Sequence, residues 1–583
     1  MFQMKALAFF QRSELTATLW SFKNEFLMVG ALSMVANVLM LTPTLYMLQV
    51  YDRVMVSQSE LTLLAMSLLT LALFAVMAFA EWLRSRVLVH AGVRLDESLG
   101  TQVFNASFQS YLNQSGAPKA RALSDLIQVR QFLTGNGIFA FFDAPWAPIY
   151  MAVLYLLHPW LGLLSLLFAL LQAALAWLGH RHTLAPSEAA VAANAQASSF
   201  LQSKLRNAEV IESMGMLGNL QKRWAQRHDT AMAQGSTAQA LTQRVMAWSK
   251  FIRYSQQSLA LGAGALLVID GQISPGAMIA ANVLMNRALA PIDQIVTGWR
   301  GFISAAAAFG RLEKLLSDVP QQPAAPAWPT PLGQLDLRNV VARAGARAQP
   351  ILQSLSFSVS GGTVLVMLGP SGAGKSTLAR VLMGIWPDVS GEVLLDGVPL
   401  AEWDRAALGP SLGYLPQDIE LFEGSLAENI ARFGKVDSDQ VIEAAHCVGL
   451  HETILRFPKG YDTPIGEAGA LLSGGQRQRI GLARAVYGNP ALIVLDEPNA
   501  NLDEAGEAAL IQTVQNMKAK GKTVIVITHR PGILAVADRL LVLMEGKVKA
   551  QGPRDAVIAA LRAATQAAPK APAAGPSAGL TPV

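Results

Sequence analysis

Charged residues are scarce in this chain of 583 residues: only 15% are Asp, Glu, Lys or Arg, whereas 52% are hydrophobic. A soluble domain usually carries about 25% charged residues, so part of this chain avoids water. The net charge of +5 is also small for such a length. Because a dedicated nucleic-acid-binding protein carries a clustered basic excess, we expect no nucleic-acid partner.

Cysteine is nearly absent as well, since Cys447 is the only one. A single cysteine excludes intrachain disulfides and a zinc site built from cysteines. A cleavable signal peptide is also lacking: charged residues such as Lys5 and Arg12 interrupt the short apolar stretches at the start of the chain. We therefore expect residues 1–25 to form a cytoplasmic N-terminal segment.

Long hydrophobic runs, by contrast, are abundant in the first half of the chain. A helix needs about 20 apolar residues to cross the hydrocarbon core of a bilayer. Six runs come close to that length, at residues 26–50, 61–83, 138–157, 160–177, 254–269 and 276–299. One such run would fit a buried core helix, but six together predict an α-helical, six-helix transmembrane domain over residues 26–318.

The loops between these runs differ in charge, and this difference predicts their orientation. The second and fourth loops are long and rich in Lys and Arg, whereas the alternate loops are short and nearly uncharged. Because basic loops stay on the cytoplasmic side, we expect both long loops and both termini there. The long loops also have helical periodicity, which predicts helices that extend beyond the membrane.

A proline-rich segment at residues 319–332 is predicted to be a linker. After it, in residues 333–560, short β-branched runs alternate with helical ones, a pattern typical of an α/β domain. The Ala- and Pro-rich residues 561–583 are predicted to form a disordered tail.

The first chemical motif of the α/β domain is a phosphate-binding loop (P-loop) between a strand pattern and a helix pattern. Its members are Gly369, Pro370, Ser371, Gly372, Ala373, Gly374, Lys375, Ser376 and Thr377. Glycines let backbone N–H groups approach phosphate oxygens, and the helix N-terminus adds a favourable dipole. We expect Lys375 to reach the β- and γ-phosphates of ATP and Ser376 to bind Mg²⁺. A glycine-rich turn without function would not require the full pattern.

Two adjacent acids, Asp496 and Glu497, follow a second apolar strand pattern. We expect Asp496 to support the Mg²⁺ shell and Glu497 to accept a proton from the attacking water. Acids at strand ends are more often solvated caps, but a P-loop in the same domain favours catalysis.

Between these motifs, residues 472–476 read Leu-Ser-Gly-Gly-Gln. This sequence resembles the signature of the ABC-family nucleotide-binding domain. The resemblance implies that Ser473, Gly474, Gly475 and Gln476 face the γ-phosphate of ATP held by the other subunit of a homodimer. An exposed Ser-Gly-Gly helix start is also a ready anion site. A merely capped surface helix would explain Ser473, but neither the glycines nor Gln476.

Other elements of the same family follow in order. Gln417 resembles the glutamine that senses Mg²⁺ and the attacking water, and His529 resembles the switch histidine that contacts the γ-phosphate. Residues 501–503 resemble a dimer-contact loop. Gly466 and Glu467 resemble an exporter loop that touches intracellular helices.

One departure concerns adenine, which many family members stack on an aromatic residue in the first strand. No aromatic residue lies between Trp328 and Phe357. Arg343 or Arg347 is our candidate for that contact.

Fusion of membrane helices and ATPase in one chain favours export. Residues 42–53, 141–150 and 288–294 resemble the PrtD (protease exporter) branch of type I secretion ATPases. The resemblance implies a multi-pass inner-membrane protein of a Gram-negative bacterium, surrounded by lipid, with a cytoplasmic ATPase domain. It further implies a periplasmic membrane-fusion adaptor protein, a TolC-like outer-membrane channel and an unfolded cargo protein with an uncleaved C-terminal signal. Since only a short segment precedes residue 26, we expect no leader-processing domain.

Alternatives stay open at this point. The same ATPase would suit an exporter of lipids, drugs or peptides, or an ATP-gated channel or regulator. Intact Lys375, Glu497 and His529 disfavour the channel, and the six apolar runs exclude a soluble nucleic-acid ATPase. Arg287, in the sixth run, either lines the translocation route or extends to the membrane surface.

Overall fold

The computed structural model describes residues 14–113, 121–205, 207–319, 326, 328–345, 349–466, 469 and 471–567. The chain divides into two compact units. The first comprises Met1–Phe108 and Lys119–Pro320, and the second Gln109–Pro118 and Gln321–Val583. Half of the predicted linker and the tail after residue 567 lie outside the described residues.

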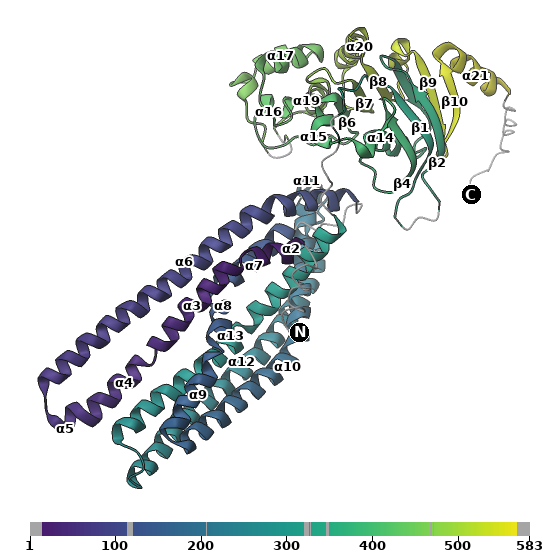
Figure 1. Cartoon of the computed structure of the whole chain (residues 1–583). Helices are drawn as coiled ribbons and strands as arrows, with labels where there is room; N and C mark the ends of the chain where they lie inside the picture. Colours follow the sequence, from purple (N-terminus) through teal and green to yellow (C-terminus); the bar gives the residue numbers. More distant parts are fainter. Residues whose placement is uncertain are drawn as a thin grey trace, which may run out of the picture. The chain divides into compact units, whose positions relative to one another are not determined.

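Long helices make up the first unit, and Figure 1 shows them running in a common direction. The six predicted runs fall in α3 (Lys23–Leu39) with α4 (Thr42–Gln49), α6 (Glu60–Asn113), α8 (Asn136–Asp143) with α9 (Trp146–Leu157), α10 (Pro159–Leu205), α12 (Leu217–Ile269) and α13 (Pro275–Asp318). Shorter elements join them: α2 (Glu14–Ser21), the π-helical η1 (Val50–Val54), α5 (Met55–Ser57), α7 (Ala122–Thr134) and α11 (Ala208–Ser213). Among the described helices, three are long and apolar enough to cross a membrane, and the bent pair α8–α9 adds a fourth.

Helix length confirms that the long loops are helical. Helix α6 has 54 residues and α12 has 53. At 1.5 Å per residue each is about 80 Å long, more than twice the hydrocarbon thickness of a bilayer. These helices therefore extend well beyond the membrane.

A buried ion pair joins three helices of this unit. Arg84 of α6 donates to Asp143 of α8 at 3.1 Å and to Ser33 of α3 at 3.2 Å. Asn37 of α3 donates to the same carboxylate at 2.8 Å and accepts from the hydroxyl of Tyr150 of α9. Because an unpaired charge at this depth is costly, the network favours the arrangement of these helices around the bend between α8 and α9. The sequence did not indicate this contact of Asp143.

The other two motifs that resemble protein exporters also supply carboxylates that join helices. Asp52 accepts a hydrogen bond from Ser274 at the start of α13, at 2.5 Å. Asp293 of α13 accepts one from Arg253 of α12, at 3.0 Å. Arg287 is exposed on α13 in the single chain, and its role stays a prediction.

Strands and helices alternate in the second unit, whose described residues form two sheets. The larger has the order β10-β9-β3-β8-β7-β6. Its strands are β3 (Val364–Leu368), β6 (Leu412–Leu415), β7 (Leu492–Asp496), β8 (Thr523–Ile527), β9 (Arg539–Met544) and β10 (Lys547–Pro553). All adjacent pairs are parallel except β9 and β10, so five strands end at one edge. The smaller antiparallel sheet contains β1 (Leu335–Ala342), β2 (Leu352–Val359), β4 (Val389–Leu395) and β5 (Val398–Pro399).

Helices accompany these sheets. They are α14 (Lys375–Leu382), α15 (Arg405–Leu408), α16 (Leu426–Ile430), α17 (Ser438–Cys447), α18 (His451–Leu455), α19 (Gly474–Val486), α20 (Glu504–Ala519) and α21 (Arg554–Ala567). Helix α21 packs on the domain through the buried side chain of Val557. The helix continues to Ala567, so the start of residues 561–583, which were predicted to form a disordered tail, is helical. Strands β3, β7 and β8 are buried along nearly their whole length, which explains their continuous apolar sequences.

Candidate nucleotide-binding site

The P-loop connects the carboxyl end of β3 to the first turn of α14. Gly374 has φ +97°, and a Cβ there would lie 2.8 Å from a Leu352 methyl group. Only glycine avoids both the strain and the clash. The ammonium group of Lys375 donates to the carbonyls of Gly369 and Pro370 at 2.8 and 2.9 Å. Burial lowers the pKa of Lys375, whereas the nearby carboxylates oppose this shift.

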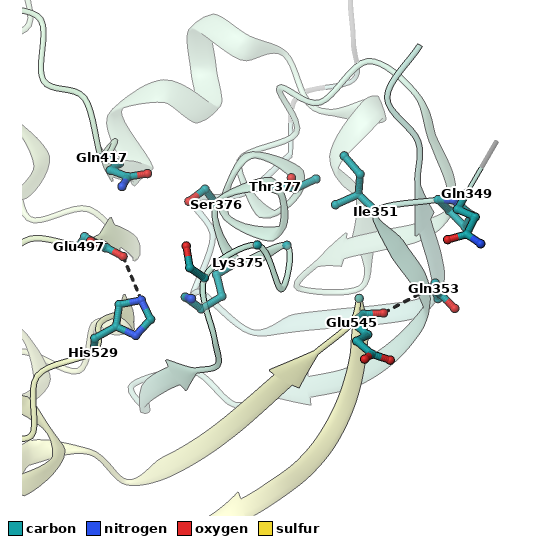
Figure 2. A pocket seen from close by; sticks show the side chains of 15 residues that line it. Gln349, Ile351, Gln353, Lys375, Ser376, Thr377, Gln417, Glu497, His529 and Glu545 are labelled. Carbon is teal, nitrogen blue, oxygen red and sulfur yellow. Dashed lines mark hydrogen bonds and ion pairs between the residues drawn. The ribbon is translucent and has the colours of Figure 1, made fainter. Parts of the chain in front are cut away.

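A cavity of about 830 Å³ opens beside the loop. It brings together these residues predicted for nucleotide chemistry: Ser371, Gly372, Gly374, Lys375, Ser376, Thr377, Gln417, Glu497 and His529. Figure 2 shows Gln417, Glu497 and His529 on one side of the loop and Gln349, Gln353 and Glu545 on the other. The cavity therefore has a catalytic side and a second side that the motifs did not indicate.

Glu497 and His529 come from neighbouring parallel strands. His529 Nε2 lies 3.2 Å from Glu497 Oε1 (Figure 2). Glu497 has φ +50°, and its N–H donates to the carbonyl of Ile527 at 2.9 Å. A left-handed conformation outside glycine is costly and is found at functional sites where surrounding contacts enforce it. This turn brings the Glu497 carboxylate to the cavity.

Asp496, the last residue of β7, is 1% exposed. Burial raises the pKa of its carboxyl group, while the Ser376 hydroxyl lowers it. Its Oδ1 atom has no hydrogen-bond partner among the described residues. A buried carboxylate oxygen of this kind is suited to a hard cation, directly or through water, and Ser376 adds a hydroxyl oxygen. The residues present therefore fit Mg²⁺.

The signature residues begin α19. Ser473 Oγ accepts from the N–H of Gln476 at 3.2 Å, and Gln476 Oε1 accepts from the N–H of Ser473 at 2.9 Å. This reciprocal pair is a capping box, which satisfies two free N–H groups of the helix. Our expectation that capping leaves Gln476 unexplained was therefore wrong. Gly475 is explained differently, since a Cβ there would lie 3.0 Å from the carbonyl oxygen of Asn501.

Not all predicted site residues line this cavity. Within the described part of the chain, Ser473, Gly474, Gly475 and Gln476 are absent from its wall, as are Gly369, Pro370, Ala373 and Asp496. The last four support the loop and the end of β7. The signature residues belong to a separate surface of the same unit.

The side without predicted residues comes from β2 and from the turn between β9 and β10. Pro350 and Ile351 give it an apolar wall, and the Gln353 side chain donates to the carbonyl of Glu545 at 3.2 Å. Gly546 has φ +73°, and a Cβ there would approach the Ile351 carbonyl oxygen to 2.2 Å. The Glu-Gly pair after an apolar run signals a turn, but its proximity to the P-loop is tertiary information.

The adenine contact of Arg343 or Arg347 stays a prediction. Arg343 is not among the residues that line the cavity; its carbonyl oxygen accepts a hydrogen bond from Trp386 at 2.8 Å. Arg347 and Glu467 lie outside the described residues.

A P-loop, paired acids and a signature helix on this sheet define an ABC-type ATPase, here fused to a helical transmembrane domain. The family models for the ABC transporter transmembrane region and the ABC transporter match residues 26–291 and 352–500. A bacterial Atm1-family ABC exporter with ATP bound has the same fold: its TM-score is 0.81 at 22% identity, over 94% of this chain and 99% of that chain.

Sequence relatives narrow the class. The type I secretion system ATP-binding protein PrsD of Rhizobium meliloti is 41% identical over 93% of this chain and 94% of its own length. The alpha-hemolysin translocation ATP-binding protein HlyB of Escherichia coli is 30% identical, over 88% of this chain and 73% of that protein. The chain belongs to the type I secretion branch of the ABC transporters. It is a membrane-bound, ATP-binding ATPase of protein export, which confirms the predicted fold class and the main predicted function.

Proposed function

We propose that the chain is the permease and ATPase subunit of a type I secretion system in the inner membrane of a Gram-negative bacterium. It exports unfolded proteins that carry C-terminal signals, through a periplasmic adaptor and a TolC-like outer-membrane channel. The similarity to PrsD along nearly the whole of both chains supports this proposal most directly. Apolar helices long enough to cross a membrane and an ATP cavity in a single chain agree with it.

The separation of the two halves of the site supports the proposal of a homodimer. Ser473 and the adjacent glycines form an exposed helix start that is suited to anions, but they do not line the cavity of their own chain. A second copy would place its signature helix over the γ-phosphate. Two chains then enclose two ATP molecules.

The roles of the cavity residues follow from their positions. The P-loop N–H groups and Lys375 bind the phosphates, and Gln417 and His529 contact the γ-phosphate region. Ser376, Gln417 and Asp496 hold Mg²⁺, which neutralises charge on the phosphates. Glu497 orients the attacking water and accepts its proton. Pro350 and Ile351 provide the apolar surface for adenine.

Secretion by cells that carry the native gene tests the proposal. In Lys375→Ala cells, one or a few large proteins should disappear from the medium and accumulate inside the cells, because the transporter no longer hydrolyses ATP. The medium and cell proteins are compared by mass spectrometry, with membrane levels of the transporter matched. Lys547→Ala, on the exposed strand β10, is the control. An unchanged profile, with the gene expressed, would contradict protein secretion and favour lipid, peptide or drug export.

The Mg²⁺ assignment has its own test. Asp496→Asn removes a negative charge without changing the volume of the side chain. The Mg²⁺ concentration that gives half-maximal ATPase activity should therefore rise about tenfold, which corresponds to the free energy of a shift of about one pKa unit. Titration of ATPase activity with Mg²⁺ at fixed ATP measures this. An unchanged midpoint would exclude Asp496 from the metal shell.

A further inference from the structure

Helix α19 makes contacts beyond its signature residues. Its first two turns touch the segment 497–503, which begins with the proposed base. Gly475 lies against the carbonyl of Asn501, and Arg479 forms an ion pair with Asp503 at 3.0 Å. Between these contacts, Gln478 lies opposite the residue pair Glu497–Pro498.

Gln478 is 2% exposed, so its amide must find partners inside the protein. Its Nε2 atom donates to the carbonyl of Pro498 at 2.9 Å and has a longer contact of 3.4 Å with the carbonyl of Glu497. Both acceptors are backbone carbonyl oxygens, and they belong to two consecutive residues. The side chain therefore fixes the orientation of the backbone from which the Glu497 carboxylate extends.

This orientation would not persist without support. Glu497 has φ +50°, and it precedes a proline, a position that favours extended backbone. The left-handed conformation is unfavourable for a residue other than glycine and needs surrounding contacts to hold it. On one side the N–H of Glu497 donates to Ile527 of β8 at 2.9 Å. On the other side Gln478 supplies the contact from α19.

We propose that Gln478 is a positioning residue: it holds the left-handed Glu497–Pro498 turn, so that the carboxylate faces the attacking water when the signature helix is seated. The inference rests on the proposed role of Glu497 and adds a residue that does not touch ATP. Because Gln478 lies in the second turn of α19, whose first residues face the partner's ATP, it also joins the two ATP sites of the dimer through one rigid helix.

The test uses Gln478→Met in the full-length dimer. Methionine keeps the length and helix propensity of glutamine but has no N–H donor. We expect kcat for ATP hydrolysis to fall about 10- to 100-fold, since small displacements of reacting groups have effects of that size. KM for ATP should change less than about threefold on the same grounds, because no phosphate contact is removed. Gln512→Met, on the exposed surface of α20, is the matched control.

A second measurement separates positioning from general destabilisation. In a Glu497→Gln background the group to be positioned has lost its function, so adding Gln478→Met should change the residual rate less than twofold. An unchanged kcat in the single variant, or equal fold-losses in both backgrounds, would overturn the inference. Full activity of Glu497→Gln alone would instead contradict the proposed role of Glu497.

Discussion

Replacing Glu497 by Gln is expected to lower kcat for ATP hydrolysis about 10²- to 10⁴-fold, the usual contribution of a general base. The amide has nearly the same shape as the carboxylate, so the turn held by Ile527 and Gln478 stays in place. It cannot accept the proton of the attacking water, however. Binding of ATP involves the P-loop and Lys375, which this change does not touch. The variant should therefore bind ATP and retain it.

Two readouts test this expectation together. Phosphate release measures turnover, and retention of radiolabelled ATP after rapid gel filtration measures trapping in the closed dimer. Glu504→Gln, at the exposed start of α20, is the control and should have native turnover. Loss of turnover together with loss of ATP retention would contradict the assignment, because it would show that Glu497 serves binding or folding.

His529 also contacts the carboxylate of Glu497, since its Nε2 atom lies 3.2 Å from Glu497 Oε1. The sequence motifs alone did not indicate this contact.

Strands that carry the nucleotide motifs were predictable because each is buried on both faces and reads as one apolar run. The strand pattern predicted before the P-loop agrees with β3, and the one predicted before Asp496 and Glu497 agrees with β7. The glycines of the P-loop were also readable as a phosphate-binding turn, because the motif is local in the sequence. The order of β3, β8 and β7 is tertiary information, and it is this order that brings His529 beside Glu497.

Contacts to backbone carbonyls were beyond sequence reasoning. Gln478 binds the carbonyl of Pro498, and every residue type offers such an acceptor. The residue types in the sequence therefore do not indicate which carbonyl Gln478 binds. Gln476 is the opposite case: Ser473 and Gln476, three residues apart, made the capping box readable from the sequence, yet this structural role was not predicted.

Arg432 extends this argument to stability. Its guanidinium group donates to five backbone carbonyls: those of Gly409, Leu412, Arg484, Ala485 and Tyr487. The last three belong to the C-terminal end of α19, where free carbonyls and the helix dipole favour a cation. Leu412 is the first residue of β6, and Gly409 lies in the 3-10 turn just before that strand. One side chain thus fastens the signature helix to the main sheet.

Arg432→Met should lower the stability of the ATPase domain by about 3–5 kcal/mol, because buried carbonyls lose a charged donor and regain nothing. For a domain of this size that corresponds to a fall of about 10 °C in the apparent unfolding temperature. Thermal unfolding of the full-length protein in detergent, followed by tryptophan fluorescence, measures it. The unfolding temperature of Arg432→Lys should lie between those of the native protein and Arg432→Met, since one ammonium group cannot reach five acceptors. The exposed Arg456→Met is the control. An unfolding temperature within about 2 °C of native for Arg432→Met, equivalent to less than about 1 kcal/mol, would mean that solvent replaces the guanidinium without cost.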